Sequence, residues 1–256
     1  MGWRQKFARK LMHYAIRLSG RADLAFILGI GAKLDALPPV EMVAPESPEA
    51  GHYLRVVLEA HRRFERLVGK ASMLHYGGRH PKHHLWTGHS AFLVDNVPEG
   101  SRVLDIGCGA SCYLMAISEK ASEIVAIDVR AQLVEASRRL NTRANVSYLV
   151  MDAMVELPPG KFDIVICSHV LEHLDDPLPL LQRLRAVASK IIVRVPLEDA
   201  TWIKLVRRDL GLFWMDDKDH RREYNAALLM EQLVESGWKR VDMHRGYDLR
   251  AIAYSE

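Results

Sequence analysis

Val103-Leu104-Asp105-Ile106-Gly107-Cys108-Gly109 is the stretch that decides the fold of this 256-residue chain. Its β-branched and aliphatic residues predict a short buried strand, which ends in an acid and a glycine turn. Gly107 and Gly109 lack a Cβ, so the backbone can turn sharply and approach a ligand closely. A helix predicted near residues 111–120 would then present its first amides to a polar group of that ligand. Because many nucleotide folds use Gly-x-Gly, this stretch is informative only together with the strands downstream of it.

Three further strand-like runs come after it at regular intervals. They are residues 124–127, which end at Asp128, residues 146–150, which are followed by Asp152, and residues 162–167. Asp128 lies about 20 residues beyond the glycines, the separation at which an acid receives ribose hydroxyls in Rossmann-type folds. Ligands of open parallel sheets bind at the carboxyl ends of the strands. The acids at three strand ends therefore predict a nucleotide-like ligand.

The alternation of strands and helices predicts the fold class. Helices are expected near 130–141, 177–188 and 225–236, and further strands at 190–195, 239–245 and 249–254. This order predicts an α/β fold: a doubly wound, Rossmann-like, seven-stranded mixed sheet with helices on both faces. A helix over residues 52–68 and a proline-rich linker or extended arm over 35–50 precede it. We expect an N-terminal helical extension and lid over 1–84 and the α/β domain over 85–256.

Four segments resemble the class I S-adenosylmethionine-dependent methyltransferases, in the small-molecule branch of that family. They are residues 103–109, 125–128, 151–153 and 162–176, which occur in the family's order. The resemblance covers roughly residues 85–254 and implies S-adenosyl-L-methionine as the cofactor. A nicotinamide cofactor is disfavoured, because the dinucleotide fingerprint needs a third glycine where this chain has Cys112. The family itself often has a third glycine at the position of Ser111, where a serine can still cap the helix.

The resemblance assigns the cofactor to residues at the ends of the first four strands. Asp105 would hold the methionine end, Asp128 the ribose, and Asp152 the adenine edge. Each carboxylate could instead be an ordinary turn or cap residue. The predicted cofactor-binding residues are Asp105, Gly107, Gly109, Asp128, Val129, Asp152, Ala153 and Ser168.

Three residues are candidates for catalysis. Methyl transfer to a hydroxyl needs a proton acceptor, and a histidine imidazole titrates near neutral pH. His169 follows the fourth strand directly, although it could instead only bond to its own loop. His220 is the second candidate, because the insertion after the fifth strand usually forms the acceptor wall in the resembled family. Tyr224 could orient His220 or the acceptor.

No metal site is predicted. Asp216, Asp217 and Asp219 could bind a divalent cation, but a solvated turn is favoured. Five histidines lie between His75 and His89, yet none forms a recognisable ligand spacing with a carboxylate. In the resembled family this segment often closes over the cofactor, which leaves substrate contact and a solvated loop as equal alternatives.

The acceptor is predicted only by class. One glutamate, Glu172, follows the fourth strand, whereas protein-arginine methylation usually needs two, and residues 168–171 lack the phrase of base-methylating enzymes. A histidine at this place fits a hydroxyl acceptor of a glycan or secondary-metabolite intermediate. The alternatives are a quinone or lipid-linked acceptor at a membrane, and a non-catalytic protein that binds S-adenosylmethionine. The atom methylated stays open.

Charge and composition limit the partners. Six of the 35 basic residues lie in the first 22 residues, which contain no acid, so the rest of the chain is slightly acidic. A nucleic-acid surface over the whole body is therefore not expected. Residues 3–18 predict a basic amphipathic helix, which would either pack on the domain or a second subunit of a homodimer, or contact a membrane surface. Three cysteines and no secretory signal predict a cytoplasmic protein, with peripheral membrane attachment as the alternative.

Overall fold

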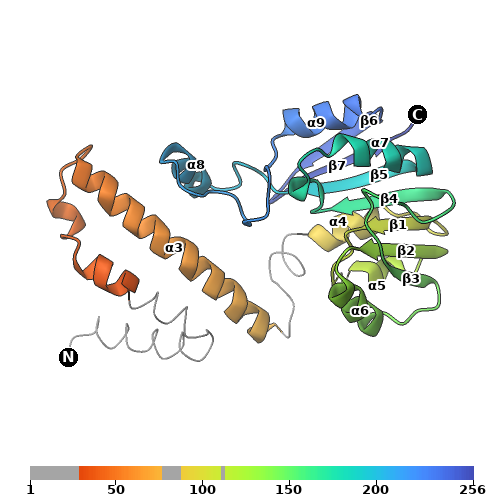
Figure 1. Cartoon of the computed structure of the whole chain (residues 1–256), viewed down its shortest axis with the longest axis horizontal. Coiled ribbons are helices and arrows are strands. Elements are labelled where there is room, and N and C mark those ends of the chain that lie inside the picture. Colours follow the sequence, from red (N-terminus) through yellow and green to blue (C-terminus); the bar gives the residue numbers. More distant parts are fainter. Residues whose placement is uncertain (1–28, 77–87, 111–112) are drawn as a thin grey trace. The chain divides into compact units, whose positions relative to one another are not determined.

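The computed structural model describes residues 29–76, 88–110 and 113–256 (Figure 1). The chain divides into two compact units, with the division between Pro81 and Lys82. The domain boundary predicted at residues 84 and 85, the predicted helix over 3–18, and the Ser111-Cys112 pair lie outside the described residues. Within the described part of the chain, no helix combines the length and the apolar character needed to cross a membrane.

The first unit is helical in its described part. Residues 29–35 are helical, a 3-10 turn η1 covers Val40–Met42, and α3 runs over Pro48–His75. Ser47 caps α3, because its side chain accepts a hydrogen bond from the Ala50 N–H at 3.1 Å. Pro48 then occupies the first turn, where its missing N–H costs nothing. The helix is therefore longer than the predicted 52–68, and the extended arm predicted over 35–50 is interrupted by helical turns.

The second unit is built on one seven-stranded sheet in the order β3-β2-β1-β4-β5-β7-β6 (Figure 1). Strands β1 to β5 are parallel, and β7 pairs antiparallel with both β5 and β6. The predicted doubly wound mixed sheet is confirmed. The strands are β1 Arg102–Ile106, β2 Glu123–Asp128, β3 Val146–Val150, β4 Phe162–Ser168, β5 Ala188–Val195, β6 Lys239–Arg245 and β7 Leu249–Tyr254.

Two helical layers cover the two faces of this sheet. On one face Leu93, Leu114 and Val134 bring α4 (His89–Asp95), α5 (Tyr113–Ile117) and α6 (Ala131–Leu140) into one apolar cluster. On the other face Leu181 and Leu229 bring in α7 (Leu178–Val187) and α9 (Ala226–Glu235). Because both faces are covered, the central strands are continuous apolar runs. This packing fixes the carboxyl ends of β1, β2 and β4 side by side.

Two helices are absent from the sequence prediction. Helix α4 begins at His89, in a segment expected to be a loop, and α8 (Trp202–Asp209) lies in the insertion after β5. The side chain of Thr201 caps α8 by accepting a hydrogen bond from the Lys204 N–H. The insertion then returns to the sheet, where Leu197 and Tyr224 form a parallel bridge.

Candidate active site

Asp105 ends β1 as a fully buried acid. Its Oδ1 accepts a hydrogen bond from the Tyr113 hydroxyl at 2.8 Å, whereas Oδ2 has no hydrogen-bond partner among the described residues. Burial raises the pKa of Asp105 to about 8; the bond from Tyr113 opposes this shift, and the charge of Asp128 adds to it. At neutral pH the carboxyl therefore retains its proton, and one polar atom remains for a ligand.

The glycine turn after β1 is shaped by close neighbours. Gly107 has a φ of 67°, and a Cβ built on it would lie 2.6 Å from Cγ2 of Val170. Gly109 has a φ of 50°, and its N–H donates to Asp128 at 2.9 Å. Both positions therefore favour glycine for its backbone conformation, and Gly107 also for space. The turn is thus fixed between the end of β2 and the loop after β4.

Asp128 ends β2 with its side chain almost fully buried. The Arg130 guanidinium contacts both of its oxygens, at 3.0 and 3.2 Å, and the Arg130 N–H donates to it at 2.9 Å. Burial alone would raise the pKa of Asp128, but the hydrogen bonds from Arg130 and Gly109 lower it below its ordinary value. Asp128 is therefore an ionised acceptor that Arg130 holds. Val129, between them, is exposed.

The residues after β3 form a turn. Asp152 is exposed, and its Oδ1 accepts a hydrogen bond from the Met154 N–H at 2.8 Å, while Ala153 is buried. One oxygen of Asp152 is thus used for a local turn, which is the alternative to cofactor binding at this position. The second oxygen is not part of that bond.

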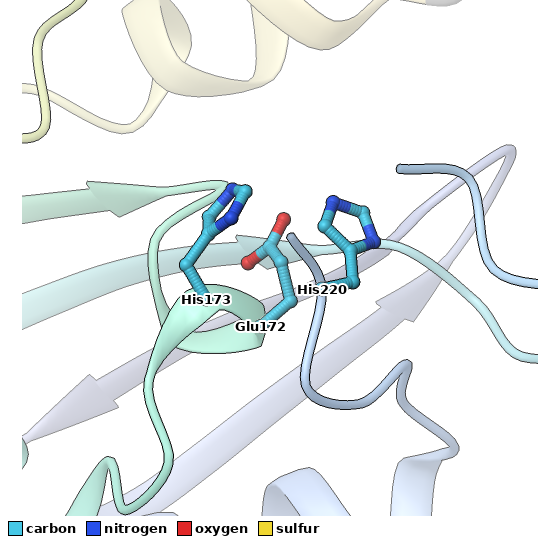
Figure 2. Close-up of side chains that lie close together, drawn as sticks. All are labelled: Glu172, His173 and His220. Carbon is cyan, nitrogen blue, oxygen red and sulfur yellow. The ribbon is translucent and has the colours of Figure 1, made fainter. Parts of the chain in front are cut away.

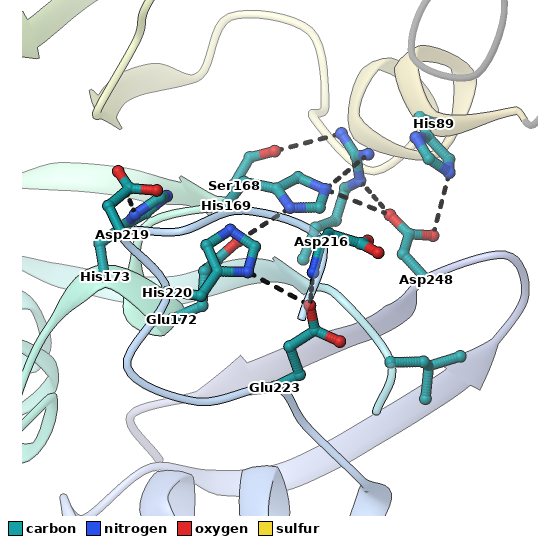
Figure 3. A network of polar contacts seen from close by, with 12 residues as sticks. His89, Ser168, His169, Glu172, His173, Asp216, Asp219, His220, Glu223 and Asp248 are labelled. Carbon is teal, nitrogen blue, oxygen red and sulfur yellow. Dashed lines mark hydrogen bonds and ion pairs between the residues drawn. The ribbon is translucent and has the colours of Figure 1, made fainter. Parts of the chain in front are cut away.

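The loop after β4 carries Ser168 and His169. The Ser168 hydroxyl accepts a hydrogen bond from Arg194 of β5 at 3.1 Å. His169 has a φ of 57°, in the left-handed region that residues other than glycine adopt uncommonly. Its Nδ1 lies 2.9 Å from Oε1 of Glu172, and its Nε2 lies 3.3 Å from the Arg194 guanidinium (Figure 3). Glu172 and Arg194 therefore fix the orientation of the imidazole.

A buried charge network supports this loop from behind. Arg194 pairs with Asp248 at 2.8 Å, and His89 lies 3.3 Å from Asp248 (Figure 3). Asp248 also contacts Arg250 at 2.7 Å. Burial and the charge of Arg194 lower the pKa of His89 to about 3, so this imidazole is neutral. The pKa of Asp248 is lowered despite its burial, chiefly by the charge of Arg194. No signal in the sequence points to Asp248, because Arg194 and His89 reach it from β5 and α4.

A second group of polar side chains joins the loop after β4 to the insertion after β5. One ligand atom each of Glu172, His173 and His220 lies within 4.8 Å of the others, with the Glu172 carboxylate between the two imidazoles (Figure 2). His173 contacts Asp219 at 3.0 Å, and His220 contacts Glu223 at 3.3 Å. Burial lowers the pKa of His220, but its bond to Glu223 and the charge of Glu172 raise it overall. The sequence alone does not single out Glu172 and His173 as ligands.

The other residues that the sequence predicts as candidates in the insertion do not belong to the cluster of Glu172, His173 and His220. Tyr224 is fully buried, and its hydroxyl donates to Gln232 of α9 at 3.1 Å, which places it in the core. Asp216 pairs with Lys204 at 2.8 Å, and Asp217 accepts a bond from its neighbouring N–H. Among the described residues, the cluster with the geometry for an ion is the one around Glu172, and the three aspartates do not form one.

Residues 104–190 match the family model described as a methyltransferase domain. The sheet order, the glycine turn and this match decide the assignment. Residues 104–190 of the second unit are a methyltransferase domain, built on the sheet described above. The predicted methyltransferase family is thereby confirmed over residues 104–190. In this methyltransferase domain the acids Asp105 and Asp128 lie at the carboxyl ends of two adjacent parallel strands, as expected for the ligand edge of such a sheet.

Curated proteins share part of this domain. A ubiquinone biosynthesis O-methyltransferase of Xanthomonas campestris pv. campestris is 37% identical over 94 residues, which are 35% of this chain and 38% of that protein. The protein of the same name from Vibrio cholerae is 31% identical over 87 residues, which are 32% and 36% of the two chains. The chain thus spans little more than a third of the length of these relatives.

Solved structures show the same fold. A chain from the complex of the Haloferax volcanii Trm112 methyltransferase activator aligns with a TM-score of 0.55 and 15% identity, over 66% of this chain and 90% of its own. The magnesium protoporphyrin IX methyltransferase of Synechocystis with bound S-adenosylhomocysteine has a TM-score of 0.50 and 21% identity, over 65% and 80%. At these identities the likeness establishes the fold of the methyltransferase domain alone.

Proposed function

We propose that this chain transfers the methyl group of S-adenosylmethionine to a hydroxyl of a small-molecule acceptor. The observation that carries the proposal is the contact between the glycine turn and the loop after β4. Val170 lies against Gly107, and the residue before it, His169, is fixed by Glu172 at 2.9 Å. The loop that packs on the turn expected to receive the cofactor therefore carries an oriented imidazole.

The residues around the turn fit S-adenosylmethionine. Oδ2 of Asp105 is a buried polar atom without a hydrogen-bond partner in the described chain, at the strand end that the glycine turn follows. Asp128 supplies an ionised acceptor for ribose hydroxyls, provided that the guanidinium of Arg130 gives up its place. Bound S-adenosylmethionine supplies an activated methyl group. The chain's part is to hold donor and acceptor at reacting distance and to exclude water.

His169 is the proposed proton acceptor. Oε1 of Glu172 accepts a hydrogen bond from the N–H at Nδ1 of the imidazole, which leaves the lone pair on Nε2 for the acceptor hydroxyl. Bound S-adenosylmethionine would supply the methyl group to the acceptor oxygen and leave as S-adenosylhomocysteine, and Nε2 of His169 would accept the hydroxyl proton. The guanidinium of Arg194 lies 3.3 Å from Nε2 and must move away before the acceptor hydroxyl can bind there.

The names of the curated relatives favour one acceptor class for the first test. They are O-methyltransferases of ubiquinone biosynthesis, which supports a hydroxyl of a quinone intermediate, one of the alternatives to a glycan acceptor. A glycan or secondary-metabolite hydroxyl is the second class to test. The deciding measurement is release of S-adenosylhomocysteine by the purified full chain with each class in turn, with mass spectrometry of the product. Tight cofactor binding without turnover on any hydroxyl would instead identify a non-catalytic binding protein.

Replacing Asp128 with alanine should weaken the binding of S-adenosylhomocysteine. The loss of a buried charged acceptor costs roughly 1.5–3 kcal/mol, which is about 10- to 150-fold in Kd. Isothermal titration calorimetry of the full chain measures it. Asp242→Ala, at an exposed position on β6, is the matched control and should bind as the wild type does. Equal affinity in both variants would remove Asp128 from the cofactor site.

Replacing His169 with alanine should lower turnover at least about 10²-fold, because the proton acceptor is lost. The affinity for S-adenosylhomocysteine should stay close to that of the wild type, since His169 is assigned to the acceptor. His244→Ala, at an exposed histidine of β6, controls for the loss of an imidazole. Unchanged turnover in the His169 variant would leave proximity alone as the source of catalysis.

A further inference from the structure

We propose that Glu172, His173 and His220 form a binding site for one divalent transition-metal ion. One ligand atom of each residue lies within 4.8 Å of the others (Figure 2). Nitrogen and oxygen ligands of zinc lie about 2.0–2.2 Å from the ion, so two ligands of one ion are at most roughly 4 Å apart. A small rotation of the side chains therefore brings the three atoms onto a single ion.

The state of Glu172 is independent evidence for a missing partner. The side chain is fully buried, and its Oε1 is held by Nδ1 of His169 at 2.9 Å. Its Oε2 is also buried and has no hydrogen-bond partner among the described residues. A buried carboxylate oxygen without a hydrogen-bond partner costs about 1–3 kcal/mol or more of folding free energy. Such oxygens are rare in native proteins. A cation between the two imidazoles would satisfy Oε2.

The two imidazoles are arranged as metal ligands usually are. Nδ1 of His173 lies 3.0 Å from a carboxylate oxygen of Asp219, and Nδ1 of His220 lies 3.3 Å from one of Glu223 (Figure 3). A carboxylate on one ring nitrogen fixes the tautomer and leaves the other nitrogen as the ligand. Glu223 is in turn held by the buried ammonium of Lys204. The rings are therefore preorganised.

Backbone contacts hold the two ligand-bearing segments together. The Arg221 N–H, next to His220, donates to the carbonyl oxygen of Glu172 at 2.7 Å. The guanidinium of Arg222 donates to the carbonyl oxygen of Leu174 at 3.3 Å. These hydrogen bonds thus dock the insertion after β5 on the loop after β4. An ion would bind to a site that is largely formed, and would lock this docking.

The ligand set indicates the class of ion. Two imidazoles and one carboxylate suit zinc, manganese, iron or cobalt, whereas magnesium and calcium prefer sites made of oxygen atoms. Three protein ligands also leave one coordination position open, as in zinc sites of the two-histidine, one-glutamate type. The site is argued from these contacts alone, so it stands or falls separately from the methyl transfer proposed above.

The test is direct metal binding by the full chain after treatment with a chelator. Calorimetric titration with Zn²⁺ and Mn²⁺, together with the visible absorption of bound Co²⁺, should show one ion per chain at this site. The bound ion should raise the melting temperature, because it binds only the folded state. Mg²⁺ should bind much more weakly. If Mg²⁺ binds here and none of the transition metals does, the proposed class of ion is wrong.

Variants locate the ion. His173→Gln and His220→Gln should each lower the affinity at least about 10-fold, and the double variant should lose the ion, leaving only binding by other histidines of the chain. His173 is partly exposed, so its replacement keeps the fold. Asp219→Asn should weaken binding about 10-fold through the orientation of His173. His244→Gln is the control. If the double variant binds as the wild type does, or the wild type binds no ion, the proposal is overturned.

Discussion

Replacing Asp105 with asparagine is expected to stabilise the cofactor-free protein increasingly as the pH rises. The pKa of Asp105 is raised from 3.8 to about 8 by its complete burial. Between these two values the folded chain keeps a proton that the unfolded chain releases. The free energy of unfolding of the wild type therefore falls with rising pH, and the fall ends near pH 8.

The asparagine variant lacks this titration. Each unit of pKa shift corresponds to about 1.4 kcal/mol, so from about pH 5 to pH 8 the variant should gain on the order of 4 kcal/mol relative to the wild type. Near pH 5 the variant can be the less stable protein, because the new amide adds a buried donor next to Tyr113. The prediction therefore concerns the change, from pH 5 to pH 8, in the difference between the free energies of unfolding of the variant and the wild type.

Urea unfolding at several pH values, without cofactor, measures this gain. Asp152→Asn is the matched control, because Asp152 is exposed, and its difference from the wild type should stay nearly constant with pH. Two parallel profiles for the Asp105 variant and the wild type would contradict the raised pKa. Burial raises the pKa of Asp105, whereas a ligand that places a positive charge near the carboxyl would lower this pKa and favour release of the proton.

The sheet can be predicted from the sequence because its signals are local. The runs 103–106, 124–127 and 162–167 are apolar on both faces, and this is the pattern that strands covered by helices on both sides require. Gly107 can be singled out for a similar reason, because the sharp turn directly after β1 needs a positive φ, which favours glycine. Asp128 is identified by its distance from the glycines.

The rest of the site depends on contacts between distant segments. Glu172 and His220 come from two loops that meet only when the insertion docks, and no spacing in the sequence indicates this. Asp248 escapes prediction for the same reason, since Arg194 and His89 reach it from other elements. The partner of Asp128 is local, yet an arginine two residues away is also typical of an ordinary protein surface.

Replacing Asp248 with alanine is expected to lower the free energy of unfolding by about 3–5 kcal/mol at neutral pH. Asp248 and Arg194 are both almost fully buried and lie 2.8 Å apart. Without the carboxylate, the guanidinium of Arg194 keeps its desolvation cost and loses its main partner. His89 cannot replace the carboxylate, because an imidazole carries no negative charge.

Two further comparisons test the cause of this loss. The pKa of Asp248 is held below its ordinary value of 3.8, so the wild type should lose this contribution as the pH falls below about 4, whereas the alanine variant should not. Exposed Asp242, on the neighbouring β6, is the matched position, and its replacement with alanine should stay within about 0.5 kcal/mol.

A double variant separates the value of the pair from the cost of breaking it. Replacing a buried ion pair with apolar residues is often nearly neutral, whereas removing one partner leaves a buried charge uncompensated. Arg194→Met combined with Asp248→Ala should therefore be more stable than Asp248→Ala alone, as chemical denaturation would show. Because Arg194 also donates to Ser168 and approaches His169, the double variant should still lose the fixed orientation of the loop after β4. A double variant less stable than the single one would mean that Arg194 stabilises the fold through this loop rather than through its ion pair.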